Sequence, residues 1–287
     1  MTRTIAIVQA RTTSSRLPGK VLQEIAGQPM LVHVVERTSR AGMVDQVVVA
    51  TTTDPADEPI VELCAAQGYA CFRGSLHDVL DRFYQAAQVF DAGVIVRITA
   101  DCPLIDPGVI DLTVRAFLGL ERGLPGRISQ RLTNLGGQPY PFDFAANRLP
   151  PPWKRTYPIG LDTEVCSLAA LERAWKEADQ KYQREHVMPY LYDDMGVNFD
   201  QPCRFRALQI DHAQNFGALR WTVDTPPDLE VVRRVFDHFD GRDDFTWLDV
   251  LALFECEPEL LEINAQIQHK TAFDIDERAN HTSKFEI

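Results

Sequence analysis

Apolar and polar residues follow two different periods along the first hundred positions. Short β-branched runs with strand character alternate with amphipathic stretches of helical spacing. The strand-like runs cover residues 4–8, 46–50, 69–72 and 94–98, and the helical stretches cover residues 29–41, 57–67 and 77–90. Continuous apolar strands joined through helices predict a mostly parallel central sheet with helices on both faces. We therefore expect an α/β fold whose ligands bind at the carboxyl ends of the strands.

The pattern weakens in the middle of the chain and returns later. Gly and Pro recur over about residues 119–158, which predicts an irregular insertion or lid. Strand-like runs follow at 159–165, 204–210 and 219–223, helices begin after Ser167 and Thr225, and a further helical stretch spans 246–267. We expect one domain over residues 1–240 and a C-terminal helical extension with a polar tail over 241–287.

Composition narrows the class of protein. The chain has 287 residues, 45% of them hydrophobic, and a net charge of −12 without a basic run, which argues against a nucleic-acid partner. No apolar stretch approaches the roughly 20 residues that span a bilayer, so we expect a cytoplasmic protein without a membrane partner. Six cysteines stand without a C-x-x-C pair, and the histidines lack zinc-type spacing, which favours reduced thiols and no zinc site.

A polar loop after the first strand carries the strongest chemical signal. Residues 9–20 hold Arg11, Arg16 and Lys20 with four hydroxyls and Gly19. Arginine offers a planar fork of donors, lysine a point charge and glycine close backbone approach, a combination that suits a polyphosphate. Neither the dinucleotide motif G-x-G-x-x-G nor the P-loop motif G-x-x-x-x-G-K-[ST] is present. The alternative for this loop is a solvated turn whose charges only maintain solubility.

This loop resembles that of the cytidylyltransferases that activate acidic sugars, the acylneuraminate and 3-deoxy-manno-octulosonate enzymes. Their pattern A-R-x-x-S-x-R-L-P-G-K is matched in order at eight positions: Ala10, Arg11, Ser14, Arg16, Leu17, Pro18, Gly19 and Lys20. Residues 48–52, 97–105 and 220–226 extend the resemblance over roughly the first 240 residues. Residues 157–165 and 184–187 are similar to the spore-coat polysaccharide biosynthesis branch.

The resemblance implies a GT-A-like nucleotide-diphosphosugar transferase fold that binds CTP. Arg11, Lys20 and Asp101 are then the catalytic residues, and Asp101 binds magnesium. The implied nucleotide-binding set is Ala10, Arg11, Ser14, Arg16, Gly19, Lys20, Thr51, Arg82 and Asp101. Arg82 lies apart from the apolar stripe of its helix, and the alternative for it is an ion pair with Asp78.

Two acids at predicted strand ends agree with a magnesium site. Asp101 follows the strand at 94–98, and Asp224 follows the run at 219–223. Mg²⁺ prefers hard oxygen ligands and usually takes one or two carboxylates with phosphate oxygens and waters, so the two acids can share one metal. Helix capping is the alternative for each, because Asp is favoured at that position.

The acceptor region departs from the octulosonate enzymes. They carry an acid at the position of Cys102, which leaves Asp101 as the only carboxylate in that corner. Candidate acceptor contacts are Tyr157, Asp162, Glu164, Arg184 and His186, with Glu185 beside them. Alternatives remain an Arg184–Glu185 ion pair and a packed His186.

The function expected from these features is Mg²⁺-dependent transfer of CMP from CTP to an acidic sugar-like acceptor, with release of pyrophosphate, for a surface polysaccharide. Two alternatives stay open: CMP transfer to a non-sugar phosphate or phosphonate, and a non-catalytic nucleotide-binding scaffold. A homodimer is expected from the apolar C-terminal stretch and from dimerisation among the related enzymes.

Overall fold

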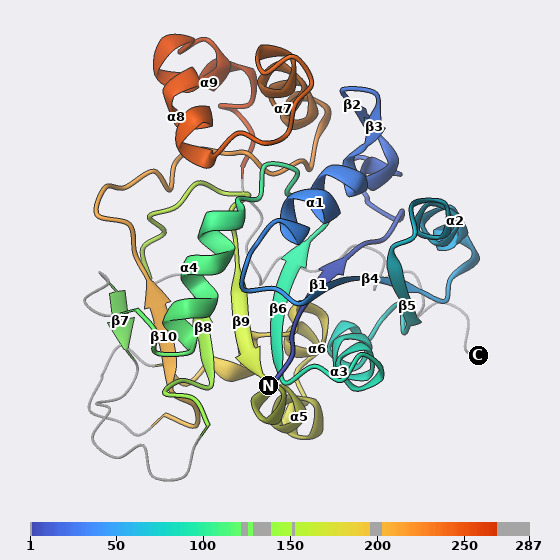
Figure 1. Cartoon of the computed structure of the whole chain (residues 1–287), viewed down its shortest axis with the longest axis vertical. Helices are drawn as coiled ribbons and strands as arrows, with labels where there is room; N and C mark the ends of the chain where they lie inside the picture. Colours follow the sequence, from blue (N-terminus) through green and yellow to red (C-terminus); the bar gives the residue numbers. More distant parts are fainter. Residues whose placement is uncertain (1, 122–125, 129–138, 151–152, 196–202, 269–287) are drawn as a thin grey trace, which may run out of the picture.

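A single large sheet organises the molecule (Figure 1). The computed structural model describes residues 2–121, 126–128, 139–150, 153–195 and 203–268, and within them the sheet has eight strands in the order β5-β4-β1-β6-β9-β8-β10-β7. Its strands are β1 (Thr4–Gln9), β4 (Gln46–Thr52), β5 (Ala70–Gly74), β6 (Val94–Thr99), β7 (Gly126–Ile128), β8 (Phe144–Ala146), β9 (Glu164–Ser167) and β10 (Ala207–Ile210). A small hairpin of β2 (Glu24–Ile25) and β3 (Gln28–Pro29) stands apart from it.

Strands β5, β4, β1 and β6 run parallel, as the sequence predicts. Ile7 on β1 lies opposite Val48 on β4 and Arg97 on β6. Strand β9 is antiparallel to both β6 and β8, so it reverses the direction of the chain in the middle of the sheet. The prediction of a mostly parallel α/β sheet is confirmed, and the carboxyl ends of β1, β4 and β6 meet at one edge.

Helices cover both faces of the sheet. They are α1 (Met30–Ser39), α2 (Glu58–Gln67), α3 (Val79–Val89), α4 (Pro107–Phe117), α5 (Leu168–Glu177), α6 (Lys181–His186), α7 (Pro226–His238), α8 (Trp247–Cys256) and α9 (Leu260–Ile263), with 3-10 turns η1 (Lys20–Leu22), η2 (Pro55–Asp57) and η3 (Pro189–Leu191). Helices α1, α2, α4, α7 and α8 contribute to one apolar cluster, and α3 and α5 to the other.

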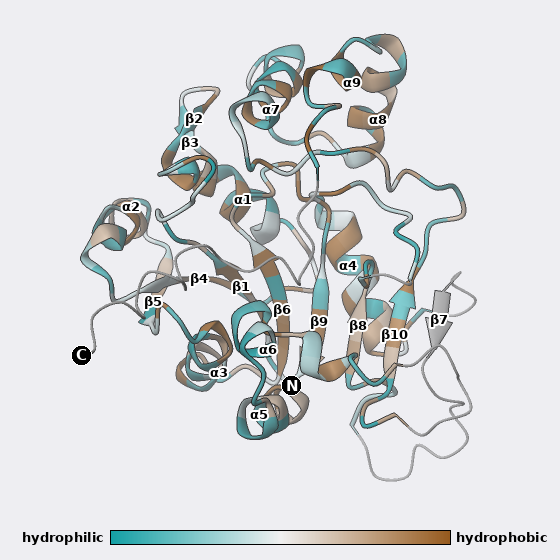
Figure 2. Cartoon of the chain, turned by 180° about the vertical axis from the view of Figure 1, so that it is seen from behind, coloured by the Kyte–Doolittle hydropathy of each residue, from teal (hydrophilic) through white to brown (hydrophobic). Residues whose placement is uncertain are grey.

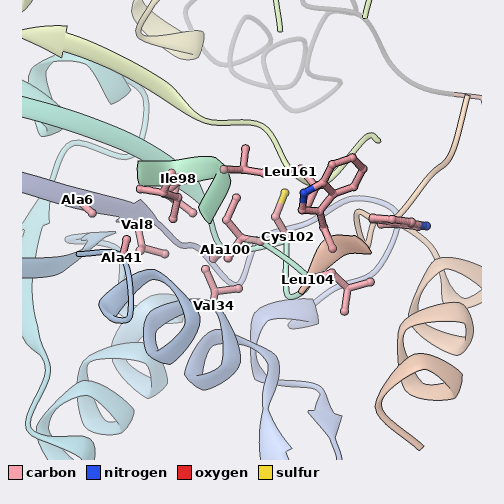
Figure 3. Close-up of a cluster of buried hydrophobic side chains, with 14 of the residues drawn as sticks. Ala6, Val8, Val34, Ala41, Ile98, Ala100, Cys102, Leu104 and Leu161 are labelled. Carbon is pink, nitrogen blue, oxygen red and sulfur yellow. The ribbon is translucent and has the colours of Figure 1, made fainter. Parts of the chain in front are cut away.

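Alternate residues of each strand supply the two clusters. Ala6 and Val8 face the α1 side, whereas Ile5 and Ile7 face the α3 side. Figure 2 shows the result, with apolar strands inside and polar residues on the outward parts of the helices. Figure 3 shows the first cluster close to the strand ends, where Ala100, Cys102 and Leu161 lie near one another. The core therefore extends up to the edge where ligands of such sheets bind.

Three predicted elements differ from the structure. The run at 219–223 forms only one isolated bridge, between Ile159 and Arg220, because its backbone pairs with two loops instead of a strand. The run at 159–165 becomes a strand only at Glu164, since Gly160 with φ of +112° turns the chain first. The helical stretch 246–267 divides into α8 and α9 around Pro258, which has no N–H to continue a helix. Residues 122–125, 129–138 and 151–152 of the predicted insertion at 119–158 lie outside the described residues, and its described part is not irregular throughout, because it supplies β7 and β8 to the sheet.

The C-terminal helices pack onto the same core as the sheet. Trp247, Val250 and Leu253 of α8 and Leu260 of α9 are buried there with residues of β1 and β6. Arg37 of α1 is fully buried and ties α1 to this region, because its guanidinium donates to the carbonyls of Ile105 (2.7 Å), Asp243 and Phe245 (3.0 Å). Leu248 and Leu261 stay exposed on α8 and α9, and the expected dimer stays a prediction.

Arg37→Leu removes three hydrogen bonds from a charged donor and leaves buried carbonyls unpaired, so it should lower the free energy of unfolding by about 3 kcal/mol. The neighbouring Arg40, which is 41% exposed and pairs with Asp243, is the matched control, and Arg40→Ala should cost less than about 1 kcal/mol. Urea denaturation measures both. An equal loss of unfolding free energy in the two variants would contradict the role of Arg37 in tying α1 to the C-terminal region.

Candidate active site

The phosphate-type loop leaves β1 and turns back through its own backbone. Ala10 donates its N–H to the carbonyl of Ala50, 3.1 Å away, so the loop starts in line with β4. The N–H groups of Ser14 and Gly19 both donate to the carbonyl of Thr12, at 2.9 and 2.8 Å. Gly19 has φ of +68°, a left-handed conformation that glycine adopts without strain. These contacts bring Lys20 to the start of η1, beneath the loop.

A buried carboxylate outside the motif anchors the loop. Asp57 is fully buried at the end of η2, and its Oδ1 accepts from the N–H and the hydroxyl of Thr12, at 2.7 and 2.8 Å. Its Oδ2 accepts from the hydroxyl of Thr52. Burial alone would raise the pKa of Asp57, but the hydrogen bonds from Thr12 and Thr52 outweigh it and lower that pKa. The sequence pattern predicts Asp57 only as the start of a helix, because its partner Thr12 lies 45 residues away along the chain.

Lys20 joins Asp101, which follows β6, to Asp224, which lies in the segment before α7. Its Nζ donates to Asp101 Oδ2 at 2.8 Å, to Asp224 Oδ1 at 2.9 Å and to the carbonyl of Val223 at 2.8 Å. The Lys20 side chain is only 11% exposed, whereas Asp101 and Asp224 are 27% and 15% exposed. All three ammonium donors are therefore engaged, and the two carboxylates face one cation from segments that are distant in sequence.

Two arginines hold the other oxygen of Asp224. Arg16 from the loop and Arg220 each place a guanidinium nitrogen 2.9 Å from Asp224 Oδ2. Asp101 is fixed through its backbone, because its carbonyl accepts from the N–H of Val223 at 2.8 Å and the hydroxyl of Thr222 at 3.1 Å. The segment at 220–224 thus lies against the end of β6 and carries Asp224 to Asp101.

The ion pairs keep both carboxylates charged. Burial would raise the pKa of Asp101, but the charge of Lys20 and hydrogen bonds from Lys20, Thr99 and Cys102 lower it to about 2. Burial and the charge of Asp101 would raise the pKa of Asp224, and Lys20 and Arg16 lower it on balance. Burial opposes the charged form of Lys20 as well, yet the two acids raise its pKa.

Neither acid caps a helix. Asp106 caps α4, where its Oδ1 accepts from the N–H of Val109 at 3.0 Å. Thr225 and Asp228 form the capping box of α7, as predicted for Thr225. The side chains of Asp101 and Asp224 are occupied instead by the cations around them, so the capping alternative does not hold for these side chains.

Arg82 is a buried cation with unused donors. It is fully buried on α3, and one nitrogen donates to the carbonyl of Ser75 at 2.7 Å, while its Nε and second terminal nitrogen have no hydrogen-bond partner among the described residues. Burial and the charges of Arg11 and Arg97 lower the pKa of Arg82 to about 10. The buried hydroxyl of Thr51, at the end of β4, is likewise without a partner there. Such groups are expected to meet a ligand or water.

Two of the residues predicted to contact the acceptor substrate, Asp162 and Glu164, form ion pairs with arginines. Glu164 pairs with Arg97, and Asp162 pairs with Arg155 at 2.9 Å. Burial raises the pKa of the Cys102 thiol, and the charges of Asp101 and Asp162 raise it further. Arg155 was not recognised from the sequence, because it lies in the weakly patterned middle of the chain.

Arg184 and Tyr157 have packing roles in the structure. Arg184 does not pair with Glu185 as one alternative held: its Nε lies 3.1 and 3.0 Å from the two oxygens of Asp78, which also caps α3. This pair also replaces the Asp78–Arg82 ion pair considered for the sequence. The ring of Tyr157 is 3% exposed and packs against His212 and Trp247. An acceptor contact of either side chain stays a prediction without support from this geometry.

A strained turn follows His186 at the end of α6. Val187 has φ of +71° and ψ of −58°, and the N–H of Met188 donates to the carbonyl of His186 at 2.9 Å, which closes a γ-turn. A β-branched residue pays about 1–3 kcal/mol for such a conformation, and strain of this kind is found at functional sites. His186 therefore stays a candidate acceptor contact.

The carboxylates of the site suit a metal ion that takes most of its ligands from phosphate and water. Within the described ranges, no three His, Cys, Asp or Glu side chains gather into a metal-holding cluster. Mg²⁺ needs only one or two protein carboxylates when phosphates supply further oxygens, and Asp101 and Asp224 fit that requirement. In the same part of the chain, no helix has the length and apolar character to cross a membrane.

The cations of the loop after β1 lie beside one carboxylate that follows a parallel strand, Asp101, and a second in the segment before α7, Asp224, an arrangement that suits nucleotidyl transfer. Residues 5–240 match the sequence model of the family described as cytidylyltransferase, and the chain belongs to that family. It is therefore a nucleotidyltransferase enzyme.

Known proteins of this kind match most of the chain. The spore coat polysaccharide biosynthesis protein SpsF of Bacillus subtilis is 29% identical over 267 residues, which cover 88% of this chain and 94% of that protein. The structure of a cytidylyltransferase from Leptospira borgpetersenii is similar with a TM-score of 0.76 and 27% identity, covering 94% of this chain and all of that one. CMP:2-keto-3-deoxy-manno-octonic acid synthetase complexed with CTP shares the fold, with a TM-score of 0.56, 19% identity and 83% and 99% coverage.

Lys20→Met should reverse the pH dependence of stability around the two acids. In the parent their pKa values are lowered from about 3.9, so the ion pairs stabilise the fold above about pH 4 and are lost as pH falls towards 2. Without the cation, two facing carboxylates repel, so the pKa of at least one rises and protonation relieves the repulsion. The variant should gain stability relative to the parent as pH falls from 7 to about 5, measured by urea denaturation. Parallel pH profiles for the two proteins would refute this.

Asp57→Ala should destabilise the loop at residues 9–20, because Asp57 holds the backbone and hydroxyl of Thr12. It leaves the Thr12 N–H and the Thr52 hydroxyl without their acceptor, and we expect a loss of about 3 kcal/mol in the free energy of unfolding. Asp54→Ala, which removes an exposed acceptor for the Ala56 N–H, should cost about 1 kcal/mol. Urea denaturation compares the two, and a loss for Asp57→Ala no larger than for Asp54→Ala would count against the anchor.

Proposed function

We propose that this enzyme transfers CMP from CTP to an acidic sugar-like acceptor with release of pyrophosphate, depends on Mg²⁺, and serves surface polysaccharide synthesis in the cytoplasm. The observation that carries the proposal is the Lys20 ammonium between Asp101 and Asp224, directly under the phosphate-type loop. The names of the similar proteins support the nucleotide, the acidic sugar and the polysaccharide.

Asp101 and Asp224 would hold the Mg²⁺. Their carboxylates are ionised, partly exposed and 2.8 and 2.9 Å from one shared ammonium, so they already form a site for positive charge. The bound ion would neutralise triphosphate charge and lower the cost of deprotonating the acceptor hydroxyl. Cys102 does not add a ligand, because burial and the charges of Asp101 and Asp162 raise the pKa of its thiol.

The cations of the loop and of α3 would bind the triphosphate. Arg11 acts on Arg82 through its charge, and Arg82 offers two buried nitrogens that have no partner among the described residues. A buried guanidinium without a directly bonded acid is costly, and an anionic ligand relieves that cost. Lys20 would join them on the phosphates once the bound ion takes its place between Asp101 and Asp224. Together these groups would hold the phosphates in line and stabilise the negative charge that develops on departing pyrophosphate.

The acceptor would lie beside Asp101, against the start of β9. Glu164 is held by Arg97 and Asp162 by Arg155, and these two pairs would line the acceptor side of the site. Arg97 keeps a buried Nε without a partner among the described residues. This N–H favours an acceptor substrate that carries a carboxylate, since a carboxylate readily accepts hydrogen bonds from a guanidinium.

Pyrophosphate release tests the proposal directly. The purified protein is given CTP, Mg²⁺ and a panel of acidic sugars, with phosphate and phosphonate acceptors for comparison, and products are identified by mass spectrometry. Lys20→Ala and Asp101→Ala should each lower kcat/KM by about 100-fold or more. Lys176→Ala is the control, because Lys176 is an exposed partner of Glu172 on α5 and should leave the rate unchanged.

Thermal shift with the four nucleoside triphosphates, with and without Mg²⁺, tests the nucleotide separately. Selective stabilisation by CTP with Mg²⁺ is expected. The proposal is wrong if no acceptor yields pyrophosphate and if Lys20→Ala and Asp101→Ala bind CTP as the parent does.

A further inference from the structure

A fully buried carboxylate collects hydrogen bonds behind Asp224. Asp228, in the first turn of α7, is 1% exposed. Its oxygens accept from Arg220 at 2.8 and 3.1 Å, from the N–H of Asp224 at 3.1 Å, and from the N–H and hydroxyl of Thr225 at 2.9 and 2.8 Å. Burial opposes its charge, but the bonds from Arg220 and Thr225 lower its pKa on balance. Asp228 thus does more than cap a helix, because it fixes the guanidinium of Arg220.

Arg220, held by Asp228, in turn orients the carboxylate of Asp224. One of its terminal nitrogens lies 2.9 Å from Asp224 Oδ2 and 3.1 Å from Asp228 Oδ2, so it is shared between the two acids. Its Nε donates to Asp228 Oδ1 at 2.8 Å. Any rotation of Arg220 that breaks the Asp228 bonds also removes the donor from Asp224 Oδ2, and with it one of the contacts that orient Asp224 towards Asp101.

The sixth donor to Asp228 comes from the C-terminal helices. Asn264 directly follows α9 and is 7% exposed. Its side-chain nitrogen donates to Asp228 Oδ1 and to the carbonyl of Arg220, each at 3.0 Å. The amide group bonds both acceptors without adding a charge to the network. Asn264 also lies beyond residue 240, where the match to the family's sequence model ends.

We infer that Asn264 is a positioning residue for the metal-binding carboxylate Asp224, through Asp228 and Arg220. The inference rests on the proposed function, because it assumes that Asp224 binds the divalent ion. The C-terminal helices α8 and α9 then belong to the catalytic unit of this chain: Asn264, directly after α9, supplies the donor, and Val250 and Leu260 bury α8 and α9 in the core.

Mn²⁺ binding tests the inference without any acceptor. Mn²⁺ replaces Mg²⁺ as a spectroscopic probe, the protein is kept in excess over CTP, and the affinity for Mn²⁺ follows from the electron paramagnetic resonance signal of the free ion. Asn264→Ala should weaken Mn²⁺ binding about five- to tenfold, less than the 10- to 100-fold typical of groups bonded directly to a metal ligand. CTP affinity at saturating Mn²⁺ should change less than about twofold, because the phosphate-binding cations are untouched.

Leu253→Ala is the matched control. Leu253 is buried on α8 and makes apolar contacts only, so its truncation costs stability without removing a donor from the network. It should leave Mn²⁺ affinity unchanged although it lowers the melting temperature at least as much as Asn264→Ala does. Asn264→Ser, which keeps one donor, should fall between the parent and Asn264→Ala and serves if the alanine variant does not fold.

Equal Mn²⁺ affinity in the parent and in Asn264→Ala would overturn the positioning role of Asn264. So would a loss of Mn²⁺ affinity in Leu253→Ala equal to that in Asn264→Ala, because the role of Asn264 would then be only structural. Asp224→Asn separates this from failure of the proposed function. If that variant binds Mn²⁺ as tightly as the parent, then Asp224 is not a metal ligand and the proposed site itself is wrong, whatever Asn264 does.

Discussion

The ion-pair bridge of Lys20 with Asp101 and Asp224 is the contact on which the rest of the site depends. It joins the loop after β1, the end of β6 and the segment before α7, which meet only in the folded chain. Taking these charges out of water is costly, and removal of one partner leaves the others uncompensated. The bridge persists because all three ammonium donors and most carboxylate oxygens have partners close by.

Two separate supports hold this bridge from opposite sides. On the loop side, Asp57 binds Thr12 and so fixes the turn that places Lys20. On the other side, Asp228 and Arg220 fix Asp224, with Asn264 behind them. Both supports are buried carboxylates kept ionised by hydrogen bonds, so the exposed groups can meet a ligand while the positioning groups stay dry. This division explains how a fold built around an apolar core can hold ionised carboxylates at its edge.

Elements with a strong local period could be predicted from the sequence, and contacts between distant residues could not. The strands at β1, β4, β5 and β6 follow from unbroken apolar runs, and the position of Asp101 follows from the end of β6. The residues Asp57, Asp228 and Asn264 were missed, because Asp and Asn at helix ends have the same pattern whether they cap a helix or support a site. Arg155 was missed because it lies in the weakly patterned middle of the chain. The ion pair of Arg184 with Asp78 was missed for a different reason, since Asp78 is 106 residues away along the chain, and of the alternatives for Arg184 the pair with Glu185 is wrong.

The account is tested most directly by an anomalous-scattering map of crystals grown with Mn²⁺ and a non-reactive analogue of CTP. It predicts one Mn²⁺ bonded to oxygens of both Asp101 and Asp224 at about 2.1 Å, the distance expected for Mg²⁺, with Lys20 moved onto a phosphate oxygen. A metal bound to the nucleotide alone, with Lys20 still bridging the two carboxylates, would contradict it.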